Sequence, residues 1–253
     1  MLHDLSRWCR RSVVASLSSR ATAGPETLVM RVVRQAALVA SALSVMGLVL
    51  PTSVAAQVYN YPAMQLPRAS VRDYTAAVAG GAGTTAVFQW REGWTTSRHL
   101  QLDVGLADRK GRENLLLLVG GSVAQELVRA AGDQPLDVLL SAGAGAAFGS
   151  GTTLVRFPVG VSVGHTFAFE YDMALTPFVH PRASLDLCSS CGRSGTGSRS
   201  EVTLNFDVGV NYQVNRQFAL RLAAAFTGSD MPGADDTFAI GFNWIPAPLM
   251  RQP

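Results

Sequence analysis

The stretch His99-Leu-Gln-Leu-Asp-Val-Gly-Leu-Ala-Asp108 alternates between apolar side chains and polar or small ones. Successive side chains of a β-strand point to opposite faces, so this period of two predicts a strand with one apolar face. The alternation recurs along most of the chain after residue 70. We therefore predict an all-β fold of about ten strands, with eight or twelve as alternatives, near residues 72–79, 84–91, 98–107, 112–124, 136–148, 152–164, 168–185, 201–213, 217–227 and 236–245.

Composition indicates which face of these strands meets lipid. Only 15% of the residues are charged, whereas a soluble surface of this size is expected to carry about 25–35% charged residues. The polar face mixes charges with many Gly, Ala and Ser residues, which suits a narrow lumen where side chains converge. We therefore predict a closed antiparallel up-and-down transmembrane β-barrel over residues 71–246, with its apolar stripes against lipid.

Aromatic residues and loop lengths favour the same architecture. Aromatic rings gather near the ends of the apolar stripes, as in the girdles that mark the two interfaces of a membrane. Tight connections at 164–167 and 214–216 alternate with long polar ones at 188–200 and 228–235, like short periplasmic turns and longer external loops. The predicted lipid-facing girdle comprises Trp90, Phe169, Tyr212, Phe218 and Trp244.

The first 56 residues have the layout of an export leader. Arg31 and Arg34 precede an uncharged apolar run over residues 36–50, and small residues then lead to a cleavage point near Ala56-Gln57. The apolar run is shorter than the roughly 20 residues that a membrane-spanning helix needs. We interpret residues 30–56 as a signal peptide and expect translation to start at Met30.

The remaining segments follow from this boundary. We expect residues 57–70 to form a periplasmic lead-in and residues 247–253 a C-terminal tail. Without residues 1–56 the chain holds 15 basic and 16 acidic residues, so the pI near 9 belongs to the leader. We therefore infer no nucleic-acid partner.

Two stretches resemble a known group of proteins. Phe238-Ala-Ile-Gly-Phe-Asn-Trp244 is similar to the last strand of Gram-negative outer-membrane barrels. Gly209-Val-Asn-Tyr-Gln-Val-Asn-Arg-Gln-Phe-Ala-Leu-Arg221 resembles a periplasmic hairpin of the small OmpA-type barrels. The resemblance implies a place in the cell outer membrane, with membrane lipid, periplasmic chaperones and the barrel-assembly machinery as partners. One departure is Pro246, which stands where those proteins commonly end on a phenylalanine.

The polar face supplies the candidate site. A barrel of this size has little spare interior, and unpaired charges there are costly, so Arg156, Arg182 and Arg221 should each find a carboxylate. We expect a plug of paired side chains rather than an open pore, although the glycines on this face leave room for water. The predicted lumen network comprises Asp103, Arg156, Glu170, Asp172, His180, Arg182, Asp207 and Arg221.

Cys188-Ser-Ser-Cys191 is the cysteine pair of the mature chain. Exported proteins meet oxidising conditions, so we expect a disulfide within this loop, with a redox centre or half of a zinc site as alternatives. The sequence predicts no cofactor and no metal ion.

Catalysis is not expected from the sequence. His180 and Asp172 lie eight residues apart on one predicted face, about 26 Å along a strand, so they cannot touch. A catalytic pair would have to come from a neighbouring strand. We therefore expect no enzyme but a barrel with a structural or surface-interaction role, whose external loops contact partners not yet identified. The alternatives are a narrow channel or small-solute-binding barrel, and a soluble secreted lipocalin-like barrel.

Overall fold

The structure is a computed structural model that describes residues 61–81, 83–109, 115–131, 134–149, 152–189, 197–229 and 235–246. Its strands are β1 (Arg72–Gly80), β2 (Gly83–Thr95), β3 (Arg98–Arg109), β4 (Leu115–Val128), β5 (Asp137–Gly149), β6 (Thr152–Gly164), β7 (Phe167–Ala168), β8 (Ala174–Ser189), β9 (Arg199–Gln213), β10 (Phe218–Thr227) and β11 (Thr237–Trp244).

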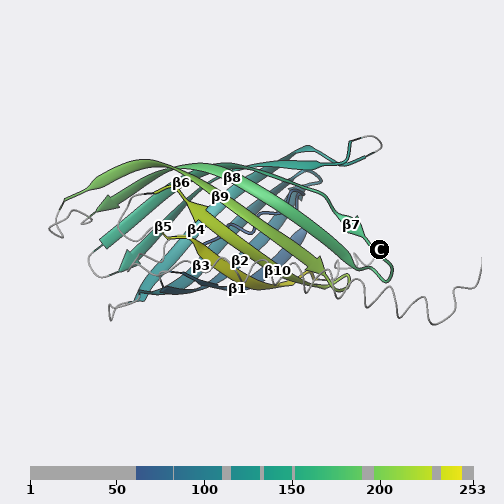
Figure 1. Cartoon of the computed structure of the whole chain (residues 1–253), viewed down its shortest axis with the longest axis horizontal. Helices are drawn as coiled ribbons and strands as arrows, with labels where there is room; N and C mark the ends of the chain where they lie inside the picture. The colour runs from purple at the N-terminus through teal and green to yellow at the C-terminus, as the bar shows by residue number, and fades with distance from the viewer. Residues whose placement is uncertain are drawn as a thin grey trace, which may run out of the picture. The chain divides into compact units, whose positions relative to one another are not determined.

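These strands form a closed antiparallel barrel of ten strands, with the two-residue β7 beside β8 (Figure 1). Each barrel strand pairs with its neighbours in the chain, and the β1–β11 pairing joins the first strand to the last. β6 pairs directly with β8, although the short β7 lies between them in the sequence. This arrangement confirms the predicted all-β, up-and-down fold, in which each of the ten barrel strands pairs with a strand on both sides.

Most predicted strand positions agree with the structure, but the prediction for residues 168–185 was wrong in its first third. The long strand of this region, β8, begins only at Ala174 and continues to Ser189. Tyr171 and Asp172 have positive φ angles of 61° and 60°, a conformation that ends extended structure. The connection between β6 and β8 is therefore a bent segment rather than part of a strand.

Apolar side chains face outward and polar ones face inward. On β3, Val104 and Leu106 are 48% and 52% exposed, whereas Gln101 and Ala107 are buried. The most enclosed large side chains include two arginines, Arg91 and Arg221, each only 1% exposed. A soluble lipocalin-like barrel requires the reverse arrangement, so that alternative was wrong. In the described part of the chain, no helix is long and apolar enough to cross a membrane.

Aromatic side chains gather on the outer surface at two levels. Tyr74 lies opposite Trp90 on one side and Trp244 on the other, and Trp244 in turn lies opposite Phe218. The Tyr74 and Trp244 rings stack with centroids 5.4 Å apart. All four lie at the end of the barrel where β1 begins. Toward the other end, a second group of outward-facing rings comprises Phe148, Phe206, Phe226 and Phe238.

The outward band leads to a first prediction. Val104 lies between the outward-facing Phe88 of β2 and Val119 of β4, in the middle of the apolar surface. We expect Val104→Arg to lower the free energy of unfolding in lipid vesicles by about 2–4 kcal/mol, because a lipid-facing guanidinium near the midplane is poorly solvated. Urea unfolding monitored by tryptophan fluorescence measures the change. Val104→Leu is the control, and equal stability of the two variants would contradict a lipid-facing surface.

Candidate functional site

The lumen is filled by the chain segment that precedes β1, residues 61–70, here called the lead-in. We expected this segment in the periplasm; its described part lies inside the barrel instead. Ala63 N donates to Asp207 Oδ2 over 3.0 Å, and Ser162 Oγ donates to the Gln65 carbonyl over 2.6 Å. Met64 is 1% exposed and packs in a cluster with the buried Phe178. The barrel wall thus satisfies the lead-in's polar backbone groups and covers its apolar side chains.

The two ends of the lead-in lie at different levels of the lumen. Arg68 forms an ion pair with Asp137 at 2.8 Å, and Ser70 N donates to His99 Nδ1 over 3.2 Å. Both partners belong to the barrel end where β1 begins. Tyr61 instead packs against a buried cluster higher in the barrel, which comprises Ala107, Leu116, Leu118, Ala147, Leu154 and Cys188. The lead-in therefore runs along the lumen.

One carboxylate holds two arginines at the base of the lumen. Asp73 Oδ1 lies 3.1 Å from Arg91 Nη1 and 3.6 Å from Arg221 Nη1. Asn243 donates a further hydrogen bond to the same oxygen over 2.9 Å. Arg91 also donates to the backbone carbonyl of Met64, so this cluster grips the lead-in. We call Asp73, Arg91, Arg221 and Asn243 the basal cluster.

Two further arginines each find a carboxylate across neighbouring strands. Arg156 on β6 binds Asp186 on β8 through both Nε and Nη2, at 2.7 and 2.6 Å. Arg182 on β8 binds Asp207 on β9 at 3.1 Å. With Arg221 beside Asp73, the expected pairing of all three arginines is confirmed. The side chains that fill the interior are therefore held by charge-assisted hydrogen bonds.

Asp207 also connects a histidine and a serine. His180 Nδ1 lies 3.4 Å from Asp207 Oδ2, and His180 Nε2 lies 3.2 Å from Ser141 Oγ. The sequence placed His180 and Asp207 on the polar face but did not indicate Ser141. No sequence signal could have found it, because Ser141 meets the histidine only through the register of β5, β6 and β8.

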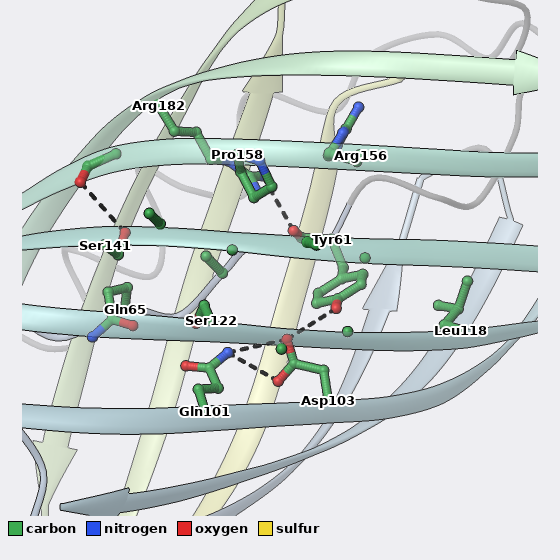
Figure 2. A pocket seen from close by; sticks show the side chains of 18 of the residues that line it. Tyr61, Gln65, Gln101, Asp103, Leu118, Ser122, Ser141, Arg156, Pro158 and Arg182 are labelled. Carbon is green, nitrogen blue, oxygen red and sulfur yellow. Dashed lines mark hydrogen bonds between the residues drawn. The ribbon is translucent and has the colours of Figure 1, made fainter. Parts of the chain in front are cut away.

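Six of the eight predicted network residues lie on the lumen side, and two do not. Asp103 accepts hydrogen bonds from Gln101 and from the Tyr61 hydroxyl, the latter over 3.2 Å (Figure 2). Glu170 and Asp172 were wrongly assigned to the lumen. They lie exposed in the bent connection before β8, where Asp172 pairs with Arg216 at 3.0 Å. The turn at residues 171–172 interrupts the alternation that would have directed them inward.

A small cavity of about 90 Å³ remains beside the lead-in. Its wall includes Ser141, His180, Arg156 and Arg182, together with Tyr61 of the lead-in. Figure 2 shows Ser122, Ser141, Arg156 and Arg182 around this space. Small residues at 142–146 leave room for it. Reported ligand pockets are larger, about 300–1,000 Å³, so the cavity suits water or a group of a few heavy atoms.

The cysteine loop and the acidic loop lie at the same end of the barrel. Cys188 is disulfide-bonded; Cys191 lies outside the described residues, so the pairing between them stays a prediction. In the connection between β10 and β11, Asp236 accepts a hydrogen bond from Thr227 N over 3.0 Å. Burial and the neighbouring Asp236 carboxylate raise the pKa of Asp235. Among the residues that the structure describes, no group of three or more His, Cys, Asp or Glu is placed to hold a metal ion.

No family model and no curated protein sequence matches the chain. Its neighbours of known structure include outer-membrane β-barrels. They include the β domain of the Bordetella autotransporter BrkA, 12% identical with a TM-score of 0.44 over 69% of this chain and 99% of that one.

Two other neighbours are of the same kind. The NanC porin is 13% identical, with a TM-score of 0.39 over 69% of this chain and 100% of the porin. The N-terminal barrel of Pseudomonas aeruginosa OprF is 10% identical, with a TM-score of 0.30 over 68% of this chain and 96% of that one. These likenesses concern the fold alone.

Proposed function

We propose that the protein is an outer-membrane β-barrel with a structural or surface-interaction role and a closed lumen. The observation that carries the proposal is the lead-in, which occupies the lumen and is bound on several sides by buried side chains. An outward apolar band with aromatic rings at two levels supports a place in the bilayer. In the cell, lipid would surround this band, after export with cleavage near Ala56-Gln57 and delivery by periplasmic chaperones to the barrel-assembly machinery.

The surface role would belong to the connections at the end opposite the start of β1. This end carries the connection after Cys188 and the connection between β10 and β11. In the usual orientation of small barrels, these longer connections face the outside of the cell. They would contact partners there, and the disulfide at Cys188 would limit their conformations.

Ion conductance tests the closed lumen. We expect the purified barrel in planar bilayers to show no discrete conductance steps, because paired side chains and the lead-in fill the interior. A band on a denaturing gel that shifts on heating confirms that the same sample is folded. Regular conductance steps from folded protein would favour the narrow channel instead, and Arg156→Ala and Arg182→Ala should then alter their size.

The cavity beside Tyr61 favours a second candidate, a small-solute-binding barrel. Its wall combines small and apolar residues with polar groups that include two guanidiniums, and its volume of about 90 Å³ admits only a small solute. Binding of a small anion such as acetate, measured by calorimetry on the folded barrel, would support this alternative. If calorimetry detects no acetate binding and the planar bilayers show no conductance steps, the results favour the structural or surface-interaction role.

A further inference from the structure

Ser141, His180 and Asp207 form a linear chain of contacts inside the barrel. Ser141 Oγ lies 3.2 Å from His180 Nε2, and His180 Nδ1 lies 3.4 Å from Asp207 Oδ2. All three residues are buried, with exposures of 7%, 3% and 0%. The two ring nitrogens thus face a hydroxyl and a carboxylate, in the order found in hydrolases that use an activated serine. The contact between Nδ1 and Asp207 is a short ion-pair distance without an aligned hydrogen bond, and such loose geometry is common in these sites without substrate.

A glycine makes the contact between histidine and serine possible. Ser141 on β5 and Arg182 on β8 are both register partners of Gly160 on β6, so the imidazole of His180 must cross β6 to reach Ser141. A Cβ atom at position 160 would lie 2.4 Å from His180 Nε2. The missing side chain therefore provides the niche in which the ring lies.

The carboxylate is also held in place. Asp207 accepts hydrogen bonds from Arg182 through Oδ1 and from Ala63 N of the lead-in through Oδ2. These contacts fix the carboxylate on the side of His180 Nδ1, where it orients the ring and stabilises the imidazolium. Ser141 Oγ also lies 3.4 Å from the Gly160 carbonyl, but it is the buried serine of the described residues that contacts a histidine. Ser184 instead bonds Thr203, and Ser162 donates to the carbonyl of Gln65.

We propose that Ser141 is the nucleophile of a hydrolytic site for short-chain acyl esters, with His180 as general base and Asp207 as its positioning carboxylate. Ser141 Oγ attacks the ester carbonyl carbon while its proton passes to His180 Nε2. The leaving alcohol takes this proton as the ester bond breaks, which gives an acyl-serine. A water molecule, deprotonated by His180, then attacks the acyl carbon and releases the carboxylic acid and free Ser141.

The cavity defines the substrate class. Ser141 and His180 line it, and its volume of about 90 Å³ accepts an acyl group of a few heavy atoms but not a long chain. Arg156 and Arg182 line the same space, and their guanidiniums, which are paired with Asp186 and Asp207, are the hydrogen-bond donors nearest to a bound acyl group. This inference goes beyond the proposed function and opposes the expectation from the sequence that the barrel is not an enzyme.

Covalent labelling tests the nucleophile. The folded full-length barrel in detergent is incubated with a small fluorophosphonate, and the modified peptide is identified by mass spectrometry. We expect the label on Ser141, its loss in Ser141→Ala, and labelling slowed about a hundredfold or more in His180→Gln. Ser184→Ala is the matched control, because it removes a buried lumen hydroxyl that does not contact a histidine, and it should label at the rate of the unaltered protein.

Substrate length tests the acyl class. p-Nitrophenyl acetate should be hydrolysed faster than p-nitrophenyl octanoate, and Ser141→Ala should abolish the difference over background. The heat-dependent gel shift shows that each variant is folded, so a failed barrel is distinguished from an inactive site. Folded protein that is not labelled at Ser141, or that is labelled equally fast without His180, overturns the proposal. A preference for octanoate overturns the short-chain class.

Discussion

Asp73→Ala is expected to destabilise the barrel by about 3–5 kcal/mol, because it leaves two buried guanidiniums without their carboxylate. Arg91 and Arg221 are each 1% exposed, and Asp73 is the acid that both of them approach. The oxygen of Thr75, to which both guanidiniums donate, is neutral and offsets their mutual repulsion only weakly. Urea unfolding of the barrel in lipid vesicles, monitored by the heat-dependent gel shift, measures the loss.

Two further variants make this result specific. Glu92→Gln breaks the Arg72–Glu92 ion pair on the outer rim, whose side chains are 41% and 31% exposed, and should cost no more than about 1 kcal/mol. Adding Arg221→Met to Asp73→Ala removes one of the two uncompensated charges and should recover part of the stability. If Asp73→Ala lowers the free energy of unfolding no more than Glu92→Gln does, water solvates the basal cluster and the cluster does not hold the barrel closed.

Deleting residues 61–67 is expected to convert a barrel without ion conductance into one that conducts ions. These residues occupy the lumen and cover the basal cluster, in which Arg91 donates to the Met64 carbonyl. Their removal leaves a water-filled path lined by polar side chains, through which ions can pass. Planar-bilayer recordings should show conductance steps at least about tenfold above the background of the unaltered protein, since among the described residues only wall side chains would then narrow the ten-strand barrel.

A single substitution distinguishes the effect of removing the lead-in from the effect of losing one of its hydrogen bonds. Tyr61→Phe removes the hydroxyl that donates to Asp103 but leaves the backbone and the ring in place. This variant should stay silent in the bilayer. If the deletion variant folds, as judged by its gel shift, and also stays silent, then the wall side chains alone close the lumen and the lead-in is dispensable for closure.

The barrel wall could be predicted from the sequence because its signal is local. Alternation over a few residues, as at 99–108, specifies both the strand and its two faces, and the near absence of lysine identifies the outer face as lipid-facing. The cost of an unpaired interior charge was enough to predict carboxylate partners for three arginines. Their actual partners were not predictable, since they depend on the register between strands.

The remaining errors arise where local alternation gives no guide to a residue's position. Glu170 and Asp172 continued an alternating pattern, but positive φ angles at 171 and 172 turned the chain away from the lumen. The lead-in has no periodicity, so nothing in it indicated that Asp207 and Ser162 would bind its backbone. Ser141 had no signal at all, because a lone serine becomes a candidate nucleophile only once a histidine from another strand lies beside it.

The position of the lead-in also constrains the order of assembly. Its partners come from strands distributed around the ring, among them Arg91 on β2, Ser162 on β6 and Asp207 on β9. The last seam to form is that between β1 and β11 if the strands pair in chain order, and β1 directly follows the lead-in. If the lead-in entered the lumen after the barrel had closed, it would have to slide along its whole length past the basal cluster. Assembly of the strands around a lead-in that is already in place avoids this step. The pairing of β1 with β11 and the filling of the lumen then occur together.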